Sequence, residues 1–230
     1  MLTGKTHRTT EYVLNELKGI GISIDTVYDI GANDSRWYKL WKPKLPDSTF
    51  FLFEANPANF CKAELGVDEQ YNHVALSDSV KEVSFYLPDT SNVENTGGSY
   101  YKEFTPQYDG ETNVKLTTTT LDQYVEDNKL PMPDFIKLDT QGSEVDILNG
   151  SKRILEHTSV ILCEVPVLPY NRGAPDLSTY ILTLQSYGFI PTGIEHIAIK
   201  SGALMQMDLV FVKKDIIQDL YKDTNKFGGF

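Results

Sequence analysis

Two carboxylates lie at or near the ends of apolar runs in the first part of the chain, at a spacing typical of a nucleotide site. Asp29 lies in the run Thr26–Ile30, which is followed at once by Gly31, and a second run ends at Glu54, twenty-three residues after that glycine. A glycine at a strand end lets the backbone turn tightly and leaves room for a ligand. A carboxylate at the end of the next strand can accept hydrogen bonds from both hydroxyls of a ribose. The pattern predicts an adenosine site in an α/β domain.

The residues after Gly31 argue against a dinucleotide. A dinucleotide site uses the pattern Gly-x-Gly-x-x-Gly to bring a pyrophosphate onto a helix N-terminus, whereas this segment reads Gly-Ala-Asn-Asp-Ser-Arg over residues 31–36. The segment holds one glycine, and Asp34 would place a negative charge beside a diphosphate. A ligand with adenosine, a positive charge and no phosphate fits better, and S-adenosylmethionine is such a ligand. A nucleotide-dependent oxidoreductase is disfavoured for the same reason.

Composition and charge limit the class of protein. The 230 residues are 40% hydrophobic and 23% charged, which predicts one globular α/β domain. The net charge of -11 argues against a nucleic-acid partner, because phosphate contacts dominate such binding. No apolar run approaches the ~20 residues of a membrane span, and the N-terminus lacks an apolar signal core, so a cytoplasmic protein is expected. Cys61 and Cys163 lack metal-site spacing and are expected to be reduced.

Hydrophobic periodicity predicts alternating strands and helices. Strands are expected at residues 26–30, 49–54, 71–76, 83–87, 114–119, 134–139, 159–164, 189–193, 198–199 and 208–212, the last two as a candidate hairpin. Caps, glycines and prolines predict helices at residues 10–20, around 37–41, and at 57–65, 121–128, 144–149 and 177–187. Trp37 and Trp41 are expected to pack in the core, and the tail 215–230 to be frayed.

A long connection separates the strands expected at 83–87 and 114–119. Residues 88–113 contain two adjacent glycines and several aromatic residues, namely Gly97, Gly98, Tyr100, Tyr101, Phe104 and Tyr108. A connection of this length inside a compact domain is usually a functional lid or a disordered insert. The aromatic rings favour a lid over the substrate.

Three segments together match a known family. They are Val-Tyr-Asp-Ile-Gly-Ala-Asn at 27–33, Phe-Glu-Ala-Asn-Pro at 53–57, and Thr-Leu-Asp at 120–122 with Phe-Ile-Lys-Leu-Asp-Thr-Gln-Gly-Ser-Glu at 135–144. In these motifs the chain resembles the FkbM family of S-adenosylmethionine-dependent methyltransferases, over residues 24–213. The resemblance implies a Rossmann-like methyltransferase fold, with a mostly parallel seven-stranded sheet, helices on both faces and an antiparallel last strand. It also implies methyl transfer to a hydroxyl oxygen.

The resemblance carries over residue by residue. It places Asp29, Gly31, Ala32, Asn33 and Glu54 at the cofactor. It places Ala75, Leu76 and Ser77 near the adenine. It places Asp139 both at the cofactor and at the reaction face. Ser35 stands where the family commonly has a second glycine. This departure should tighten the loop beside the methionine moiety.

Methyl transfer from a sulfonium needs an aligned nucleophile and a group that takes its proton. Asp29, Glu54, Asp139 and Glu164 all close apolar runs, and ligands of an open α/β sheet bind beyond the carboxyl ends of its strands. Asp139 is the preferred catalytic base and Glu164 is the alternative. A salt bridge or a loop cap is the competing role for Glu164.

Three further residues have mainly structural interpretations, and a metal site is considered with them. Glu144, in the first turn of a helix, is expected to interact favourably with the helix dipole. Lys137 is expected to extend toward water or to pair with an acid, and His196 is a minor candidate for the base. A divalent metal between Asp139 and Glu164 is chemically feasible, but no spacing requires it and no metal is predicted.

These observations favour a single methyltransferase domain over residues 1–230. It divides into an N-terminal helix at 1–23, a catalytic core at 24–213 and a tail at 214–230. The expected reaction is S-adenosylmethionine-dependent O-methylation of a sugar, a glycan or another small metabolite, with no nucleic acid and no membrane as partner. The alternative is a non-catalytic module that binds a nucleotide or a partner on the same fold.

Overall fold

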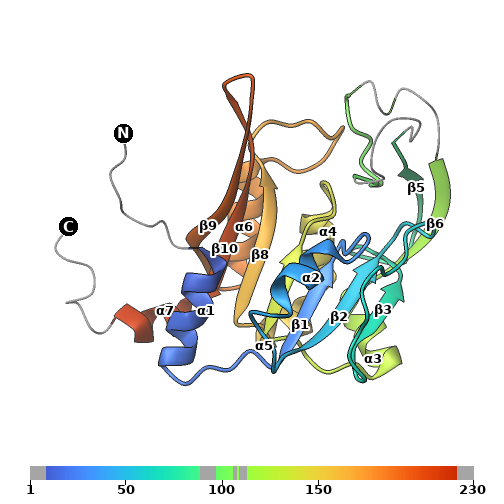
Figure 1. Ribbon diagram of the computed structural model, residues 1–230. Coiled ribbons are helices and arrows are strands. Elements are labelled where there is room, and N and C mark those ends of the chain that lie inside the picture. The colour runs from blue at the N-terminus through green and yellow to red at the C-terminus, as the bar shows by residue number, and fades with distance from the viewer. Residues whose placement is uncertain (1–8, 89–96, 106–107, 109–112, 222–230) are drawn as a thin grey trace.

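The computed structural model describes residues 9–88, 97–105, 108 and 113–221. Its centre is a seven-stranded sheet in the order β3-β2-β1-β7-β8-β10-β9 (Figure 1). The strands are β1 (Thr26–Ile30), β2 (Thr49–Glu54), β3 (Gln70–His73), β7 (Phe135–Leu138), β8 (Val160–Pro166), β9 (Phe189–Lys200) and β10 (Ala203–Lys213). The last strand in the chain, β10, runs antiparallel to both of its neighbours. The predicted Rossmann-like fold with an antiparallel last strand is confirmed.

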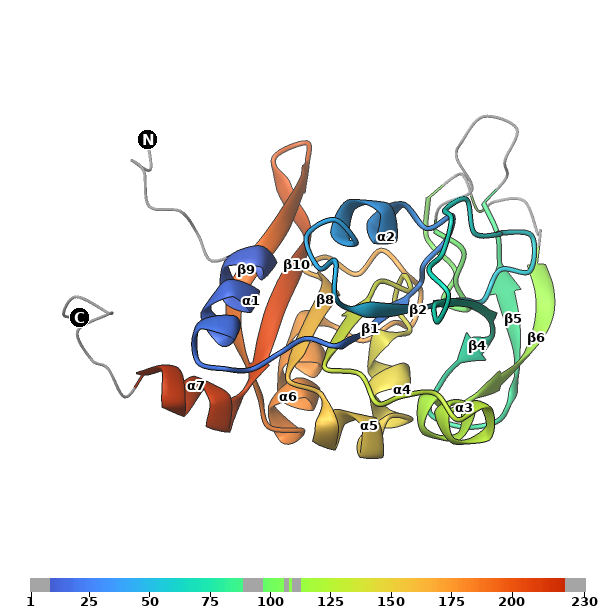
Figure 2. The ribbon, with the colours of Figure 1, turned by 60° about the horizontal axis from the view of Figure 1, so that its bottom comes forward.

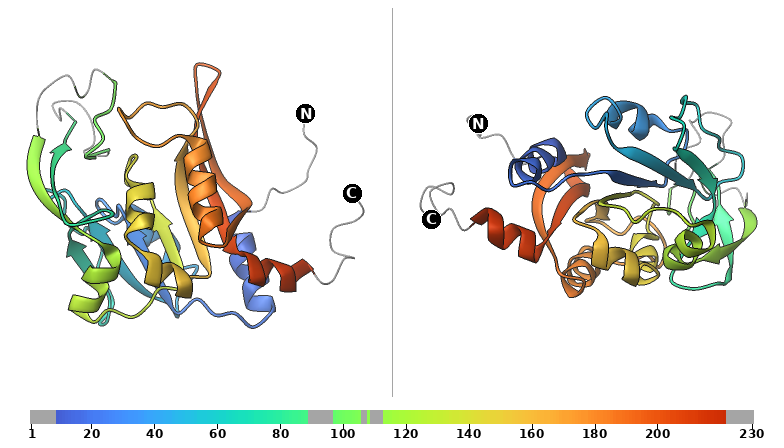
Figure 3. Two further views of the ribbon diagram at one scale, coloured as in Figure 1. Left: turned by 180° about the vertical axis from the view of Figure 1, so that it is seen from behind. Right: turned by 90° about the horizontal axis from the view of Figure 1, so that it is seen from below.

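Helices cover both faces of this sheet, as the view from below in Figure 3 shows. Successive strand residues face opposite sides, so each strand contributes to two apolar clusters. One cluster joins the sheet to α1 (Thr10–Gly19), α2 (Arg36–Trp41) and α7 (Lys214–Tyr221). The other joins it to α3 (Leu121–Asn128), α4 (Glu144–Asn149), α5 (Lys152–His157) and α6 (Leu177–Ser186). Trp41 is buried and Trp37 stacks on it at 5.3 Å, so the predicted core role of both tryptophans is confirmed.

The expected strand at residues 71–76 is divided between two sheets. After β3 the backbone N–H of Val74 donates to the carbonyl of Glu54, and the chain then enters β4 (Ala75–Leu76). This short strand pairs with β6 (Asn113–Thr119), which also pairs antiparallel with β5 (Glu82–Tyr86). The result is a three-stranded sheet beside the main one, seen at the right of Figure 2.

The helix predicted at residues 57–65 is wrong. The chain from 55 to 69 forms turns without a helix, although the side-chain oxygen of Asn56 accepts a hydrogen bond from the N–H of Ala58. The N–H of Lys62 donates to the hydroxyl of Ser35 instead of to a helical carbonyl. Contacts with the loop after β1 therefore replace the intrahelical bonds.

Three differences concern the second half of the chain. The periodicity did not predict α5, which lies directly after α4. The strands expected at 189–193 and 198–199 are parts of one strand, β9, which forms a long hairpin with β10 that projects beyond the sheet in Figure 1. The tail forms α7 over residues 214–221, where Ile217 is buried in the core, so the prediction of fraying is wrong there; residues 222–230 lie outside the described part.

The strand expected at 208–212 is the C-terminal part of the longer strand β10, which begins at Ala203. The remaining predicted elements agree with the structure to within two residues. In the described part of the chain, no helix is both long and apolar enough to cross a membrane. Cys61 and Cys163 are free thiols, and Cys163 is buried in the core.

Candidate active site

A pocket opens at the carboxyl ends of β1, β2 and β7. In the seven-stranded sheet, β2 and β3 lie on one side of β1, and β7, β8, β10 and β9 lie on the other, so the pocket lies where the strand order changes direction. Ligands of open α/β sheets bind at this position. The apolar side chains of the lining, here called the apolar wall, are those of Ile30, Phe53, Val74, Leu76, Phe85 and Ile147.

Gly31 permits the close approach of β1 and β7 at the base of the pocket. Its φ angle is 82°, and a Cβ atom at this position would overlap the carbonyl oxygen of Asp139. Only glycine combines this backbone conformation with such a close contact. The structure thus explains why a single glycine follows β1.

Ser35 takes a glycine-like conformation without being glycine. Its φ angle is 66°, in the left-handed region. Its N–H donates to the carbonyl of Ala32 at 2.8 Å, and its hydroxyl accepts from the N–H of Lys62 at 3.1 Å. The serine therefore connects the loop after β1 to the loop after β2.

Glu54 connects the loops that follow β1 and β2, and it also lines the pocket. One carboxylate oxygen accepts from the N–H of Asn33 at 2.7 Å, and the other accepts from the N–H of Asn56 at 2.7 Å. Burial raises the pKa of Glu54 above its ordinary value, against the lowering effect of these two bonds. Each carboxylate oxygen has a second lone pair, so Glu54 can accept further hydrogen bonds from a ligand.

The structure places the predicted site residues in two groups. The pocket lining includes Gly31, Asn33, Glu54, Ala75, Leu76 and Asp139. Asp29, Ala32, Ser77 and Glu164 lie outside the lining. The hydroxyl of Ser77 is engaged by Asp78 and Tyr100.

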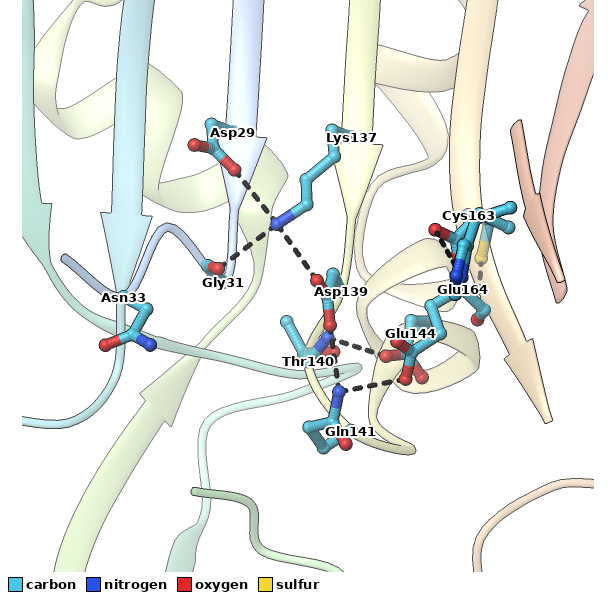
Figure 4. Close-up of polar contacts among 12 residues, drawn as sticks. Asp29, Gly31, Asn33, Lys137, Asp139, Thr140, Gln141, Glu144, Cys163 and Glu164 are labelled. Carbon is cyan, nitrogen blue, oxygen red and sulfur yellow. Dashed lines mark hydrogen bonds and ion pairs between the residues drawn. The ribbon is translucent and has the colours of Figure 1, made fainter. Parts of the chain in front are cut away.

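Lys137 joins two of the predicted acids beneath the pocket (Figure 4). Its ammonium lies 3.2 Å from Asp29 Oδ1 and 3.3 Å from Asp139 Oδ2, and it donates to the carbonyl of Gly31 at 3.2 Å. Burial alone lowers the pKa of Lys137, but the charges of Asp139 and Asp29 outweigh it and the pKa is raised. The pairing predicted for Lys137 is confirmed, whereas its extension toward water is wrong because the side chain is buried.

Asp139 and Glu164 are linked by Gln141, which the sequence did not indicate. The amide nitrogen of Gln141 donates to Asp139 Oδ1 and to Glu164 Oε1, each at 2.9 Å. Asp139 lines the pocket with 39% of its side chain exposed. Glu164 is buried and also accepts from Gln206 at 2.6 Å and from Tyr170 at 3.2 Å. Burial, followed by the charge of Asp139, raises the pKa of Glu164 well above its ordinary value.

Glu144 fixes the loop between β7 and α4. Its carboxylate accepts from the N–H of Thr140 at 2.6 Å and from the N–H of Gly142 at 3.0 Å, and the hydroxyl of Tyr180 donates to it at 2.5 Å. The buried carboxylate therefore acts through specific bonds to the loop, beyond the expected interaction with the helix dipole. Ser143 precedes α4 and makes no capping hydrogen bond with its side chain.

Residues 97–100, here called the pocket roof, contribute to the pocket lining. Gly97, Gly98 and Tyr100 line the pocket, and the hydroxyls of Tyr100 and Tyr101 donate to the same oxygen of Asp146 at 2.9 and 2.8 Å. These bonds attach the segment to α4. The lid predicted at 88–113 lies partly outside the described residues, and a role in acceptor binding stays a prediction.

His196 lies apart from the pocket lining. It is exposed on β9, with its Nδ1 3.9 Å from Asp208 Oδ2 on β10. Burial, with the charge of Asp139, raises the pKa of Asp208 to about 6. Across the described residues, no group of three or more His, Cys, Asp or Glu side chains is arranged to hold a metal ion.

Comparison with known proteins identifies relatives. A family model described as "Methyltransferase FkbM domain" matches residues 29–191. The chain is 25% identical over 146 residues to the hexuronic acid methyltransferase AglP of Haloferax volcanii, covering 61% of this chain and 56% of AglP. It is 26% identical over 186 residues to the 2-O-methyltransferase NoeI of Sinorhizobium fredii, covering 74% of this chain and 76% of NoeI. The match thus spans little more than half the length of the first relative.

Solved structures also align with most of the chain. A precorrin-6y C5,15-methyltransferase from Geobacter metallireducens aligns at a TM-score of 0.46 and 15% identity, over 88% of this chain and 87% of that one. Magnesium protoporphyrin IX methyltransferase from Synechocystis, with bound SAM, aligns at a TM-score of 0.44 and 8% identity, over 88% of this chain and 79% of that one.

Proposed function

The chain belongs to the FkbM methyltransferase family, and from this membership we propose that it transfers a methyl group from S-adenosylmethionine to a hydroxyl of a sugar or glycan. The names of the two curated relatives support a sugar-like acceptor, because one is a hexuronic acid methyltransferase and the other a 2-O-methyltransferase. We further propose that residues 24–213 form the catalytic core of a single domain.

The charge of the pocket lining is the main observation that supports S-adenosylmethionine as the cofactor. Glu54 and Asp139 are acids of the lining, and no lysine or arginine occurs among its described residues. A diphosphate would lack a cationic partner there, whereas a sulfonium would meet a carboxylate. The apolar wall from Ile30 to Ile147 suits an adenine ring, and Glu54 retains lone pairs for ribose hydroxyls. The residues present therefore fit S-adenosylmethionine.

Each side chain has a defined task in this proposal. Bound S-adenosylmethionine supplies an electrophilic methyl group. Glu54 orients the ribose, and the pocket roof at 97–100 excludes water from the apolar wall. Asp139 accepts the proton of the acceptor hydroxyl while that oxygen gains the methyl group, and it later releases the proton to solvent. Lys137 balances the negative charge of Asp139 when the carboxylate is ionised.

A non-catalytic module is the competing function. Such a module would need the cofactor contacts of Glu54 but no acid at the reaction face. The partly exposed carboxylate of Asp139 in the lining supports the enzyme instead.

Thermal unfolding with different ligands tests the proposal. S-adenosylhomocysteine at a hundred times its Kd should stabilise the fold by about 2.7 kcal/mol, whereas NAD at the same concentration should leave Tm unchanged. Transfer of a labelled methyl group to sugars with free hydroxyls then tests the activity. Equal stabilisation by NAD would overturn the cofactor assignment, and ligand binding without transfer to any hydroxyl acceptor would favour the non-catalytic module.

A further inference from the structure

The side-chain amide of Gln141 lies between two acids, Asp139 in the pocket lining and Glu164 outside it. Gln141 Nε2 donates one hydrogen bond to Asp139 Oδ1 and one to Glu164 Oε1, both at 2.9 Å (Figure 4). An amide nitrogen has two hydrogens, so these two bonds use its full donor capacity. Gln141 also lines the pocket, whereas Glu164 does not. Glu164 therefore has a route to the pocket through this amide.

The backbone of Gln141 is held from several sides in an uncommon conformation. Its φ angle is 58°, in the left-handed region that non-glycine residues rarely adopt. The N–H groups on either side of it, from Thr140 and Gly142, are both bound by Glu144. Its carbonyl accepts from the side chain of Asn171. A strained residue that its surroundings hold so firmly is typical of a functional site.

The Gln141 amide with its two hydrogen bonds is here called the bridge. The other hydrogen-bond donors to Asp139 and Glu164 explain why the bridge matters for Asp139. Asp139 has Lys137 on its second oxygen, so without Gln141 the carboxylate can turn both oxygens toward the ammonium and away from the pocket. Glu164 has the neutral donors Tyr170 and Gln206, which keep it in place with or without the bridge. The orientation of Asp139 thus depends on Gln141 more than that of Glu164 does.

We propose that Gln141 is a positioning residue that holds the Asp139 carboxylate toward the pocket, and that Glu164 influences the reaction only through this amide. The inference rests on the proposed methyl transfer. It assigns Asp139 alone as the acid that meets the acceptor, and it makes Glu164 the anchor of the bridge.

Gln141→Met removes both hydrogen bonds and keeps an unbranched side chain of similar length. The kcat should fall roughly 10- to 100-fold, which corresponds to the loss of a hydrogen bond to a charged group. The KM for S-adenosylmethionine and the Kd of S-adenosylhomocysteine should stay within about threefold, because Glu54 and the apolar wall are untouched. Gln123→Met, at an exposed position on α3, is the matched control and should leave kcat unchanged.

A double-mutant cycle tests the route from Glu164. Glu164→Gln should lower kcat in the parent and have almost no further effect in the Gln141→Met background, because residues that act through one contact are not additive. In cofactor-free protein, Glu164→Gln should also shift the NMR signals of the Gln141 side-chain amide, which are assigned by their loss in Gln141→Met. Additive losses in kcat together with an unchanged amide signal would overturn the proposed route.

Gln141→Glu gives a pH readout that a purely structural role would not produce. An ionised carboxylate at this position cannot donate, and it would lie against Asp139 and Glu164. The titratable groups that act on Glu164 are Asp139, Glu144, Asp208 and Tyr170, and Lys137 is the cation paired with Asp139. Turnover should be lower than in Gln141→Met at neutral pH and should partly recover below about pH 6, where a protonated carboxyl again donates. A pH profile parallel to that of the parent would contradict the proposal.

The outcomes separate this inference from the proposed function. A parent protein that neither binds S-adenosylhomocysteine nor transfers a methyl group would overturn the function itself. An active parent whose Gln141→Met variant folds and keeps kcat within about threefold would overturn the inference alone.

Discussion

The ammonium of Lys137 lies 3.2 Å from the carboxylate of Asp29, and both side chains are closed off from solvent. Breaking a buried ion pair by removing one partner typically costs about 3–5 kcal/mol, because the other charge stays buried alone. Removal of either partner should therefore destabilise the strand ends that form the base of the pocket.

Lys137→Met should lower the free energy of unfolding by about 3–5 kcal/mol at pH 7.5. Burial already raises the pKa of Asp29, and the loss of Lys137 would raise it further. An acid with a raised folded pKa loses stability as pH increases from its unfolded value of about 3.9, so the deficit should shrink at pH 4.5. Urea unfolding at both pH values measures this.

Two controls accompany that experiment. Asp29→Asn added to Lys137→Met should recover part of the loss, because no uncompensated charge stays at that position. Lys44→Met breaks the exposed pair with Glu11 and should change stability by at most about 1 kcal/mol. Equal losses of unfolding free energy in the two lysine variants would show that the loss of the buried pair costs no more than the loss of the exposed pair.

Glu54→Ala should weaken S-adenosylhomocysteine binding roughly 10- to 150-fold, since hydrogen bonds to a charged group contribute about 1.5–3 kcal/mol. Glu69→Ala is the matched control, because Glu69 is a buried acid that also accepts a backbone N–H bond, from Gly66, but lies outside the pocket lining. It should destabilise the fold and leave affinity within about threefold. Calorimetry that shows unchanged affinity for the Glu54 variant would remove this residue from the site.

Asp139→Asn should lower turnover by about 10²–10⁴-fold, the usual contribution of a positioned general base, because an amide cannot accept the hydroxyl proton. Glu164→Gln should cost less, since Glu164 lies outside the pocket lining. Single-turnover rates with saturating cofactor measure both. If Glu164→Gln proves the more damaging change, the base lies on β8 and Asp139 orients the acceptor.

Asp208→Asn should alter the pH dependence of stability. The pKa of Asp208 is raised to about 6, mainly by burial, so its favourable contribution is fully present below about pH 3.9 and is lost as pH rises through about 6. The parent should therefore lose about 2 kcal/mol relative to the variant between pH 4.5 and 7.5. Parallel curves of unfolding free energy against pH would contradict this.

Asp146→Ala should release the pocket roof, because the hydroxyls of Tyr100 and Tyr101 lose their shared acceptor. Affinity for S-adenosylhomocysteine should fall roughly tenfold, with faster ligand dissociation. Asp127→Ala removes an exposed acid that accepts from Gln123 and is the control. Unchanged dissociation kinetics in the Asp146 variant would show that the roof does not retain the ligand.

The sequence by itself determined the strand ends that carry the site. The apolar runs that form β1 and β2 coincide with their predicted limits, and Gly31 and Glu54 follow from local patterns, because alternation and backbone turns depend on neighbouring residues. The acids at the carboxyl ends of the strands could be predicted in the same way, whereas the seven-stranded sheet with its antiparallel last strand was implied by the resemblance to the FkbM family.

Only the tertiary structure decided which groups meet at that edge. Asn56 and Pro57 form a strong helix start, yet the chain after them bonds to Ser35 and no helix forms. The burial of Lys137 between two acids, and the amide of Gln141 between Asp139 and Glu164, bring together β1, β7 and β8. Such contacts depend on how strands distant in the chain are placed side by side, which no local pattern of residues contains.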